Sequence, residues 1–315
     1  MKGIEKENTA ESALIFLFPG QGSQQVGMGS AWRARNPIVQ RTYEEAEQAF
    51  GGGLLQLMSE GPLESLTATE VAQPAILTVS TAYARVLAEA GIQPDYVLGH
   101  SLGEYSALVS SGALDFSDAV RLTRLRGKAM QEAVPVGVGT MTALVGARDT
   151  AKVRALCDAC AEDEVLEPAG FNCPGQVVLA GNMGAIERAE KRAKEFGCGV
   201  AKRLTVSAPF HCSLLSPAGE RLAAALEEVE VRDPNIPYVA NVDSELVRHA
   251  EGVRARLVDQ VSKPVLFQQS VELLGTVTNP TWLEVGAGKT LSGLVKRTLR
   301  GSTVDNFEAE KWLAS

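Results

Sequence analysis

The sequence predicts an α/β fold in which a large unit with a parallel sheet carries a smaller inserted unit. Apolar runs of strand length alternate with segments of helical periodicity, which is typical of a parallel sheet covered by helices. Between residues 137 and 207 the order changes to β-α-β-β-α-β, which is typical of a separate compact sheet. With 315 residues, 45% of them hydrophobic, the chain can bury a core of that size.

The first predicted element is the continuous apolar run at residues 13–18, which Pro19 and Gly20 end. A run without polar alternation indicates a strand buried on both faces, as in a parallel sheet. A second short strand is predicted at residues 96–98, and helical periodicity appears at residues 39–50, 73–90, 105–109 and 116–134. The large unit therefore begins as alternating strands and helices.

A Pro-Val-Gly-Val-Gly segment at residues 135–139 interrupts this alternation. Beyond it the sequence predicts strands at 140–146, 165–171, 176–180 and 200–206, and helices at 150–162 and 185–196. A Pro-Gly pair in the turn at residues 172–175 favours reversal between the middle strands. Because this is the split βαβ, ferredoxin-like order, we expect an inserted domain at 137–207 within a main domain formed by 1–136 and 208–315.

The main domain resumes with predicted helices at 214–228, 253–260 and 268–274 and a strand at 281–285. The glycine-rich run that follows resembles a phosphate-binding loop, but Leu283 stands where that loop needs its first glycine. Gly20 and Gly22 begin a dinucleotide-binding pattern whose third glycine is replaced by Gln25. Neither nucleotide fingerprint is complete.

Composition narrows the functional classes further. The formal net charge of -8 gives no basic face for phosphates, so a nucleic-acid partner is not expected. No apolar run reaches the roughly 18–20 residues of a membrane span, and residues 1–8 are too acidic and polar for a signal or transit peptide. We therefore expect a cytoplasmic protein with no membrane partner.

The five cysteines are odd in number and unevenly spaced, which argues against a disulfide framework. Cys157 and Cys160 form a C-x-x-C pair, but no second pair or nearby histidine completes the four ligands of a structural metal. No metal site is expected.

Residues 99–103, Gly-His-Ser-Leu-Gly, form a G-x-S-x-G motif between a predicted strand and a predicted helix. A serine on such a tight turn needs small neighbours two residues away on either side, so that its hydroxyl stands clear. The carboxyl end of a parallel strand is also where α/β sheets usually place their sites. Ser101 is therefore the candidate nucleophile.

A serine hydroxyl needs a base, and histidine serves best near neutral pH. Of three histidines, His100 adjoins the nucleophile but points off the turn differently, and His249 lies in a polar run. His211, where the main domain resumes, is the candidate base. Asp243 and Glu245 are available as a third member without distinguishing spacing, so a Ser-His dyad held by a backbone carbonyl is the alternative.

Acyl transfer also needs N–H donors for the tetrahedral oxyanion. The amide after the nucleophile, that of Leu102, is the expected first donor. Gln21, in the glycine-rich loop after the first strand, is the expected second donor. An ordinary tight turn is the alternative interpretation of that loop.

Several motifs resemble those of one family. They are F-P-G-Q-G-S-Q at 18–24, G-H-S-L-G-E-Y-S-A-L at 99–108, R-G-K-A-M-Q at 126–131, N-C-P-G-Q at 172–176, A-P-F-H at 208–211 and E-V-G-A-G-K at 284–289. Together, and in this order over nearly the whole chain, they resemble the malonyl-CoA:acyl carrier protein transacylases of fatty acid synthesis. The resemblance implies an α/β-hydrolase-like large domain with a parallel sheet and a ferredoxin-like insert.

The resemblance implies that Ser101 is acylated, that His211 is its base, and that the Gln21 and Leu102 amides form the oxyanion hole. It also implies that Arg126, of the R-G-K motif, pairs with the malonyl carboxylate, which a planar guanidinium does in bidentate geometry.

Further substrate contacts are implied at Gln73, Asn172 and Phe210. Phe210 resembles the residue that accompanies malonyl over methylmalonyl selection in related polyketide acyltransferases. Where relatives often have N-P-V-Q-W, this chain has Lys-Pro-Val-Leu-Phe at 263–267. The histidine-orienting carbonyl is accordingly assigned to Leu266.

The implied activity is that of an acyl carrier protein S-malonyltransferase. The malonyl group passes from malonyl-CoA through a malonyl-serine to the phosphopantetheine thiol of acyl carrier protein, in ping-pong order. No metal or bound cofactor is expected, since the coenzyme A thioester is the substrate, and a monomer is expected. The alternatives are a free-standing polyketide synthase acyltransferase, a serine thioesterase, and a noncatalytic carrier-binding module.

Overall fold

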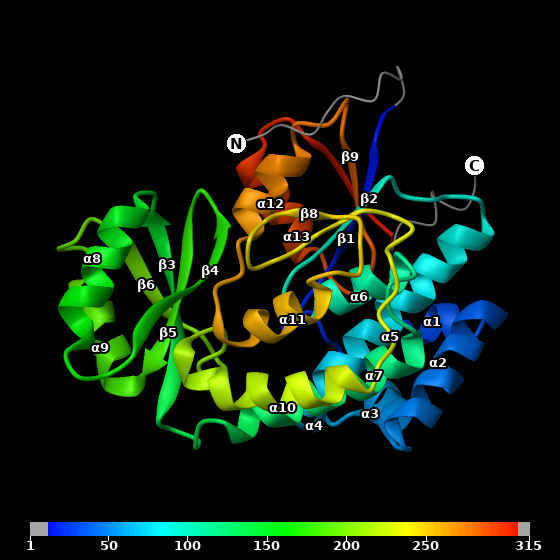
Figure 1. The fold of residues 1–315 in the computed structure, drawn as a ribbon, viewed down its shortest axis with the longest axis horizontal. Helices are drawn as coiled ribbons and strands as arrows, with labels where there is room; N and C mark the ends of the chain where they lie inside the picture. The colour runs from blue at the N-terminus through cyan, green and yellow to red at the C-terminus, as the bar shows by residue number, and fades with distance from the viewer. Residues whose placement is uncertain (1–11, 308–315) are drawn as a thin grey trace.

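The computed structural model describes residues 12–307, so the polar leader at residues 1–8 lies outside the described part. The larger of two sheets contains β1 (Leu14–Phe18), β2 (Tyr96–Gly99), β7 (Tyr238–Val239), β8 (Leu246–Val247), β9 (Thr281–Glu284) and β10 (Thr303–Asn306). Its strand order is β10-β9-β1-β2-β7-β8 (Figure 1). Every neighbouring pair is parallel except β7 and β8, which confirms the predicted α/β fold.

Helices cover both faces of this sheet. They are α1 (Ser30–Arg33), α2 (Pro37–Phe50), α3 (Leu54–Glu60), α4 (Leu63–Thr67), α5 (Thr69–Glu89), α6 (Gly103–Ser110), α7 (Phe116–Glu132), α10 (Ser216–Glu227), α11 (Val253–Ser262), α12 (Phe267–Leu274) and α13 (Thr290–Thr298). Successive side chains of β1 enter different layers, because strand side chains alternate between faces. Phe16 and Phe18 join the core formed with α2, α5 and α7, whereas Ile15 and Leu17 join the core formed with α12 and α13.

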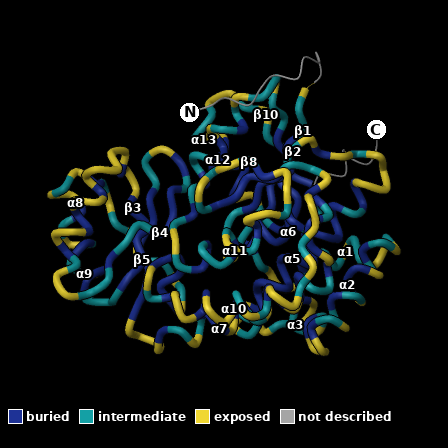
Figure 2. Tube along the Cα trace, in the orientation of Figure 1, coloured by how far each residue is buried: buried dark blue, intermediate teal, exposed yellow. Residues whose placement is uncertain are grey.

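The burial pattern agrees with this two-layer packing, since the central strands and much of α5 are buried (Figure 2). Helix α5 extends over 21 residues and is almost entirely buried along its first four turns. Among residues 12–307, no helix combines the length and apolarity that crossing a bilayer requires.

The helices predicted from periodicity are all present, and their starts follow local capping chemistry. The Asn36 side chain accepts hydrogen bonds from the Ile38 and Val39 amides at the start of α2. Asp115 caps α7 in the same way. Several short elements were not predicted because segments of a few residues carry little periodicity: α1, α3, α4, β7, β8 and β10. Helix α13, of nine residues, was not predicted either.

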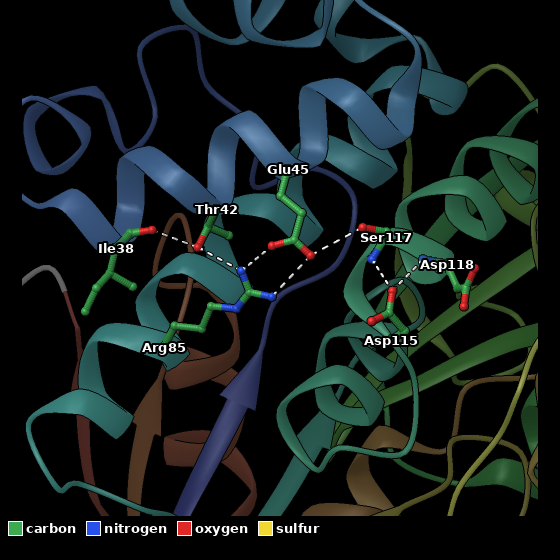
Figure 3. Close-up of polar contacts among 7 residues, drawn as sticks. All are labelled: Ile38, Thr42, Glu45, Arg85, Asp115, Ser117 and Asp118. Atoms are coloured by element: carbon green, nitrogen blue, oxygen red, sulfur yellow. Dashed lines mark hydrogen bonds and ion pairs between the residues drawn. The ribbon is translucent and has the colours of Figure 1, made fainter.

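A polar network at one end of the helical layer joins α2, α5 and α7 (Figure 3). The guanidinium of Arg85 donates to Glu45 at 2.7 Å and to Thr42 at 3.1 Å, and Ser117 donates to the other oxygen of Glu45 at 3.3 Å. The same guanidinium lies over the Phe116 ring. The Arg85 side chain is 38% exposed, so this network is partly hydrated.

The second sheet and its helices come from one continuous stretch of the chain. The elements are β3 (Gly139–Ala147), α8 (Thr150–Ala161), β4 (Leu166–Cys173), β5 (Gly175–Asn182), α9 (Met183–Arg192) and β6 (Gly199–Arg203). The strand order is β4-β5-β3-β6, with every neighbouring pair antiparallel. Apolar residues of α8 and α9 form one core with this sheet. The predicted β-α-β-β-α-β order is confirmed.

Backbone hydrogen bonds join the inserted unit to the segment that leads into α12 of the larger unit. The Val265 amide donates to the Ala169 carbonyl at 3.0 Å, and the Phe171 amide donates to the Val265 carbonyl at 2.9 Å. The segment before α12 thus pairs with β4 of the inserted unit. This pairing closes one side of the site described below.

Candidate active site

Ser101 lies at the tight turn between β2 and α6. Its φ of 52° is in the left-handed region, which is uncommon for a residue with a side chain. A Cβ on Gly99 would lie 1.9 Å from the Gly103 backbone, and a Cβ on Gly103 would lie 2.0 Å from the Phe18 carbonyl oxygen. The G-x-S-x-G spacing is therefore required by backbone contact, as the sequence predicts.

His211 contacts the serine directly. Its Nε2 lies 2.7 Å from Ser101 Oγ, although 110 residues separate the two along the chain. The histidine also has a positive φ, 63°, in the loop between β6 and α10. His100 Nε2 instead lies 2.9 Å from Asn172 Oδ1, and the His249 side chain is 80% exposed beside Asp233. The structure thus brings together the predicted serine and histidine.

The backbone group that orients the histidine belongs to Gln260. His211 Nδ1 lies 2.6 Å from the Gln260 carbonyl oxygen. The prediction of Leu266 was wrong, because that carbonyl lies at the start of α12 and accepts from Ser270 and Ser244. A carbonyl only accepts, so Nδ1 carries the proton and Nε2 is left to accept from the serine hydroxyl.

Electrostatic surroundings keep this imidazole neutral. Burial, and after it the neighbouring Arg126 charge, lowers the pKa of His211 to about 3, while the hydrogen bond to the Gln260 carbonyl acts in the opposite direction. Of the two acids considered as a third member, Asp243 pairs with Arg256 at 2.7 Å and accepts from the Glu245 amide. The described contacts therefore form a serine-histidine pair held by a backbone carbonyl.

Arg126 is a buried cation beside the nucleophile, with 1% of its surface exposed. Its guanidinium donates to Gln73 Oε1 at 2.7 Å, to Gln260 Oε1 at 2.8 Å and to Ser101 Oγ at 3.2 Å. Its Nε has no partner among residues 12–307. All of its partners are neutral, so its charge stays available to an anion.

Three buried polar residues outside the predicted set complete the site: Glu104, Asn241 and Gln260. Asn241 Oδ1 accepts from the Ser101 amide at 2.7 Å, and Asn241 Nδ2 donates to the Gly99 carbonyl at 2.8 Å. Gln260 Nε2 donates to the Ser101 carbonyl at 3.0 Å and to Glu104 Oε2 at 2.6 Å. These contacts hold the turn of the nucleophile from two sides.

Glu104 is the one charged residue of α6, which is the sequence signal that singles it out. Burial raises its pKa to about 7, while the hydrogen bond from Gln260 acts in the opposite direction. Its Oε2 also accepts from the Asn241 amide at 3.2 Å. Its Oε1 is buried and unpartnered within the described chain.

A cavity of about 430 Å³ opens onto the serine. Its lining includes all the predicted substrate and oxyanion residues: Gln21, Gln73, Leu102, Arg126, Asn172 and Phe210. Met141, Ala143 and Val178 of the inserted sheet form an apolar part of the wall. Both units of the chain therefore build the site.

The remaining motifs lie outside this chemistry. All five cysteines are buried free thiols. In the part of the chain that is described, no group of three His, Cys, Asp or Glu side chains is arranged to hold a metal ion. The glycine-rich segment after β9 leads into α13, whose Leu291 and Ser292 amides donate to the buried Glu284 carboxylate.

Comparison with known proteins agrees with this geometry. Residues 15–312 match the acyl transferase domain family. The malonyl CoA-acyl carrier protein transacylase of Escherichia coli K12 is 46% identical over 298 residues, which cover 93% of this chain and 96% of that protein.

Two solved structures have the same fold. An acyl carrier protein S-malonyltransferase from Vibrio cholerae matches with a TM-score of 0.91 and 41% identity, covering 94% of this chain and 96% of that one. A malonyl-transacylase in complex with a type II polyketide synthase acyl carrier protein also gives 0.91 and 41%, covering 96% and 98%. The chain belongs to the acyl transferase family, among the malonyl-CoA:acyl carrier protein transacylases.

Proposed function

We propose that this protein transfers the malonyl group of malonyl-CoA to the phosphopantetheine thiol of acyl carrier protein. The observation that carries the proposal is the contact of Ser101 Oγ with both His211 Nε2 and the Arg126 guanidinium. A nucleophile, a base and a buried cation then meet at one atom. This combination suits an acyl group that bears its own carboxylate.

The first half-reaction acylates the serine. Ser101 Oγ attacks the thioester carbonyl while its proton passes to His211 Nε2. The amides of Gln21 and Leu102 line the cavity and donate to no other group of residues 12–307, so both are free to stabilise the tetrahedral oxyanion. The C–S bond then breaks, and coenzyme A leaves as a thiol with the proton returned from the histidine.

The second half-reaction runs the same steps with a different thiol. The carrier thiol gives its proton to His211 as its sulfur attacks the serine ester. The ester bond breaks, and the serine oxygen recovers the proton. Arg126 holds the malonyl carboxylate throughout, with Gln73 fixing the guanidinium and with Asn172 and Phe210 at the cavity wall. The coenzyme A thioester is the substrate, so this chemistry calls for no metal or bound cofactor.

Intact-mass measurement after mixing with malonyl-CoA tests the proposal. We expect one malonyl adduct on wild-type protein, its loss upon addition of acyl carrier protein bearing phosphopantetheine, and no adduct on the Ser101→Ala variant. An absent wild-type adduct contradicts the proposal and favours a noncatalytic carrier-binding module. Turnover of malonyl-CoA without carrier protein favours a serine thioesterase.

A polyketide synthase acyltransferase is the second candidate, because one structural relative was solved with a polyketide carrier protein. The reaction would be the same for both candidates, so the carrier protein that accepts the malonyl group distinguishes them. Rates of malonyl transfer to a fatty acid carrier and to a polyketide carrier, measured side by side, separate the two pathways.

We also infer an α/β-hydrolase-like catalytic domain at 1–136 and 208–315 and a ferredoxin-like domain at 137–207. The parallel order around β1 and the antiparallel order β4-β5-β3-β6 support this division. A cytoplasmic monomer without a membrane partner is part of the same proposal. Light scattering of the purified protein tests the monomer.

A further inference from the structure

The Gln260 amide lies at the centre of the buried network, and its orientation is chemically defined. Three acceptors surround Nε2: the Ser101 carbonyl at 3.0 Å, Glu104 Oε2 at 2.6 Å and Asn241 Oδ1 at 3.4 Å. The opposite atom, Oε1, faces the Arg126 guanidinium at 2.8 Å. A flipped amide would direct an oxygen at three acceptors and an N–H at a cation.

Glu104 provides the strongest constraint on this orientation. It makes the shortest contact to Nε2, and it is the only one of the three acceptors that can carry a full charge. Its own position is fixed by burial in α6 and by the Asn241 amide, so it cannot move to follow a rotated glutamine.

We infer that Glu104 is a positioning residue, whose Oε2 locks the Gln260 amide so that Oε1 holds Arg126 in place for the substrate carboxylate. The inference rests on the proposed function, since it concerns how the malonyl group is selected. Glu104 touches none of the reacting atoms itself: it acts through the Gln260 amide, and secondarily through Asn241, whose backbone amide donates to the same Oε2. The same glutamine gives its backbone carbonyl to His211, but that carbonyl does not depend on the side-chain rotamer.

The inference predicts different effects on acylation by malonyl-CoA and by acetyl-CoA. Without Glu104 the Gln260 side-chain amide can rotate, and its hydrogen bond to Arg126 weakens. This change affects malonyl-CoA more than acetyl-CoA, because the acetyl group has no carboxylate for Arg126 to bind. The Glu104→Ala variant should therefore acylate Ser101 with malonyl-CoA about tenfold more slowly, the size of a typical coupling in a polar network, and should lose clearly less of its rate with acetyl-CoA.

A conservative variant distinguishes the acceptor atom from the charge. Glu104→Gln keeps an oxygen where Oε2 stands and removes the charge, so it should restore malonyl acylation to within about threefold of wild type. Ser106→Ala is the matched control: Ser106 is buried on the same helix, and its hydroxyl has no hydrogen-bond partner in the described chain, Gln260 included.

The deciding experiment is a double-mutant cycle with Gln260→Met, which removes the amide and keeps the backbone carbonyl. Ser101 acylation by each thioester is followed by intact mass in wild type, both single variants and the double variant, with melting temperatures recorded for all four. If Glu104 acts through the amide, Glu104→Ala adds less than about threefold to the loss already caused by Gln260→Met.

Two results overturn the inference. One is that the two single losses multiply in the double variant, and the other is that Glu104→Ala slows malonyl and acetyl acylation equally. If wild-type protein forms no malonyl adduct at all, the proposed function itself has failed, and this inference fails with it. A wild-type adduct combined with multiplying losses rejects the inference alone.

Discussion

Arg85 and Arg126 each join helices, but in opposite surroundings. Arg85 is 38% exposed and meets the carboxylate of Glu45, so its charge is neutralised where it stands (Figure 3). Arg126 is buried and meets only amide and hydroxyl oxygens, from Gln73, Gln260 and Ser101. The first arrangement gives modest stability, and the second leaves a buried charge uncompensated.

This difference shows what a binding cation requires. A guanidinium that already holds a carboxylate has little to offer a second one, whereas neutral acceptors fix its position and leave its charge to the ligand. The acid nearest to Arg126 in the network, Glu104, is linked to it through Gln260. The Gln260 amide between them fixes the position of Arg126 and leaves its positive charge unneutralised.

The largest expected effect is that of Arg126→Met, which removes the uncompensated charge at similar volume. Malonyl acylation of Ser101 should fall about 100-fold or more, because a buried charge pair is lost, while acetyl acylation changes far less. The melting temperature should stay near that of wild type, since the desolvation cost of the buried cation disappears with its hydrogen bonds. Retained preference for malonyl-CoA would contradict the assignment.

The second prediction concerns pH and the buried acid of the same network. The folded-state pKa of Glu104 is raised from 4.5 to about 7, so its contribution to stability is complete below pH 4.5 and is lost as pH rises through 7. Relative to Glu104→Gln, wild type should therefore lose on the order of 3 kcal/mol across this window. Melting temperatures of both proteins from pH 5 to 8 check the sign, and parallel curves would reject it.

The third prediction concerns a variant in which Arg126 receives a carboxylate partner, as Arg85 already has. Gln73→Glu places a carboxylate of the same shape against Arg126, as Glu45 stands against Arg85. Malonyl acylation should fall about tenfold because the cation is now neutralised, while acetyl acylation is spared. The ratio of the two rates is the measurement, with wild type and Arg126→Met as references. An unchanged ratio would show that the charge of Arg126 need not be free.

The smallest effect is expected for Arg85→Met. The partly hydrated pair with Glu45 should contribute about 1 kcal/mol or less to stability, and the methionine keeps contact with the Phe116 ring. Denaturant unfolding measures the change, and acylation rates for both thioesters should match wild type. A loss of malonyl selectivity here would mean that the two networks are coupled.

The parts of the site that the sequence predicted are those with a local pattern. Gly99 and Gly103 identify Ser101, because only glycine fits those two contacts. His211 followed from elimination among three histidines. Arg126 is one arginine among several on α7, and only the resemblance singled it out.

The missed residues act through groups that leave little trace in a sequence. A backbone carbonyl is the same in every residue, so nothing local distinguishes Gln260 from Leu266 as the partner of His211. Asn241 and Gln260 reach the turn of Ser101 from 140 and 159 residues away. Strands as short as β7 and β8 likewise exist because neighbouring strands pair with them, which no local periodicity reveals.

The backbone pairing of Val265 with Ala169 and Phe171 bears on how this enzyme tells acyl groups apart. Those hydrogen bonds tie β4 of the inserted sheet to the segment that leads into α12, and Ala169, Gly170 and Val265 line the cavity where the two meet. Because this pairing holds the two units together at the cavity, we expect that a bulkier acyl group is accommodated by shortening side chains of the lining such as Phe210 or Met141.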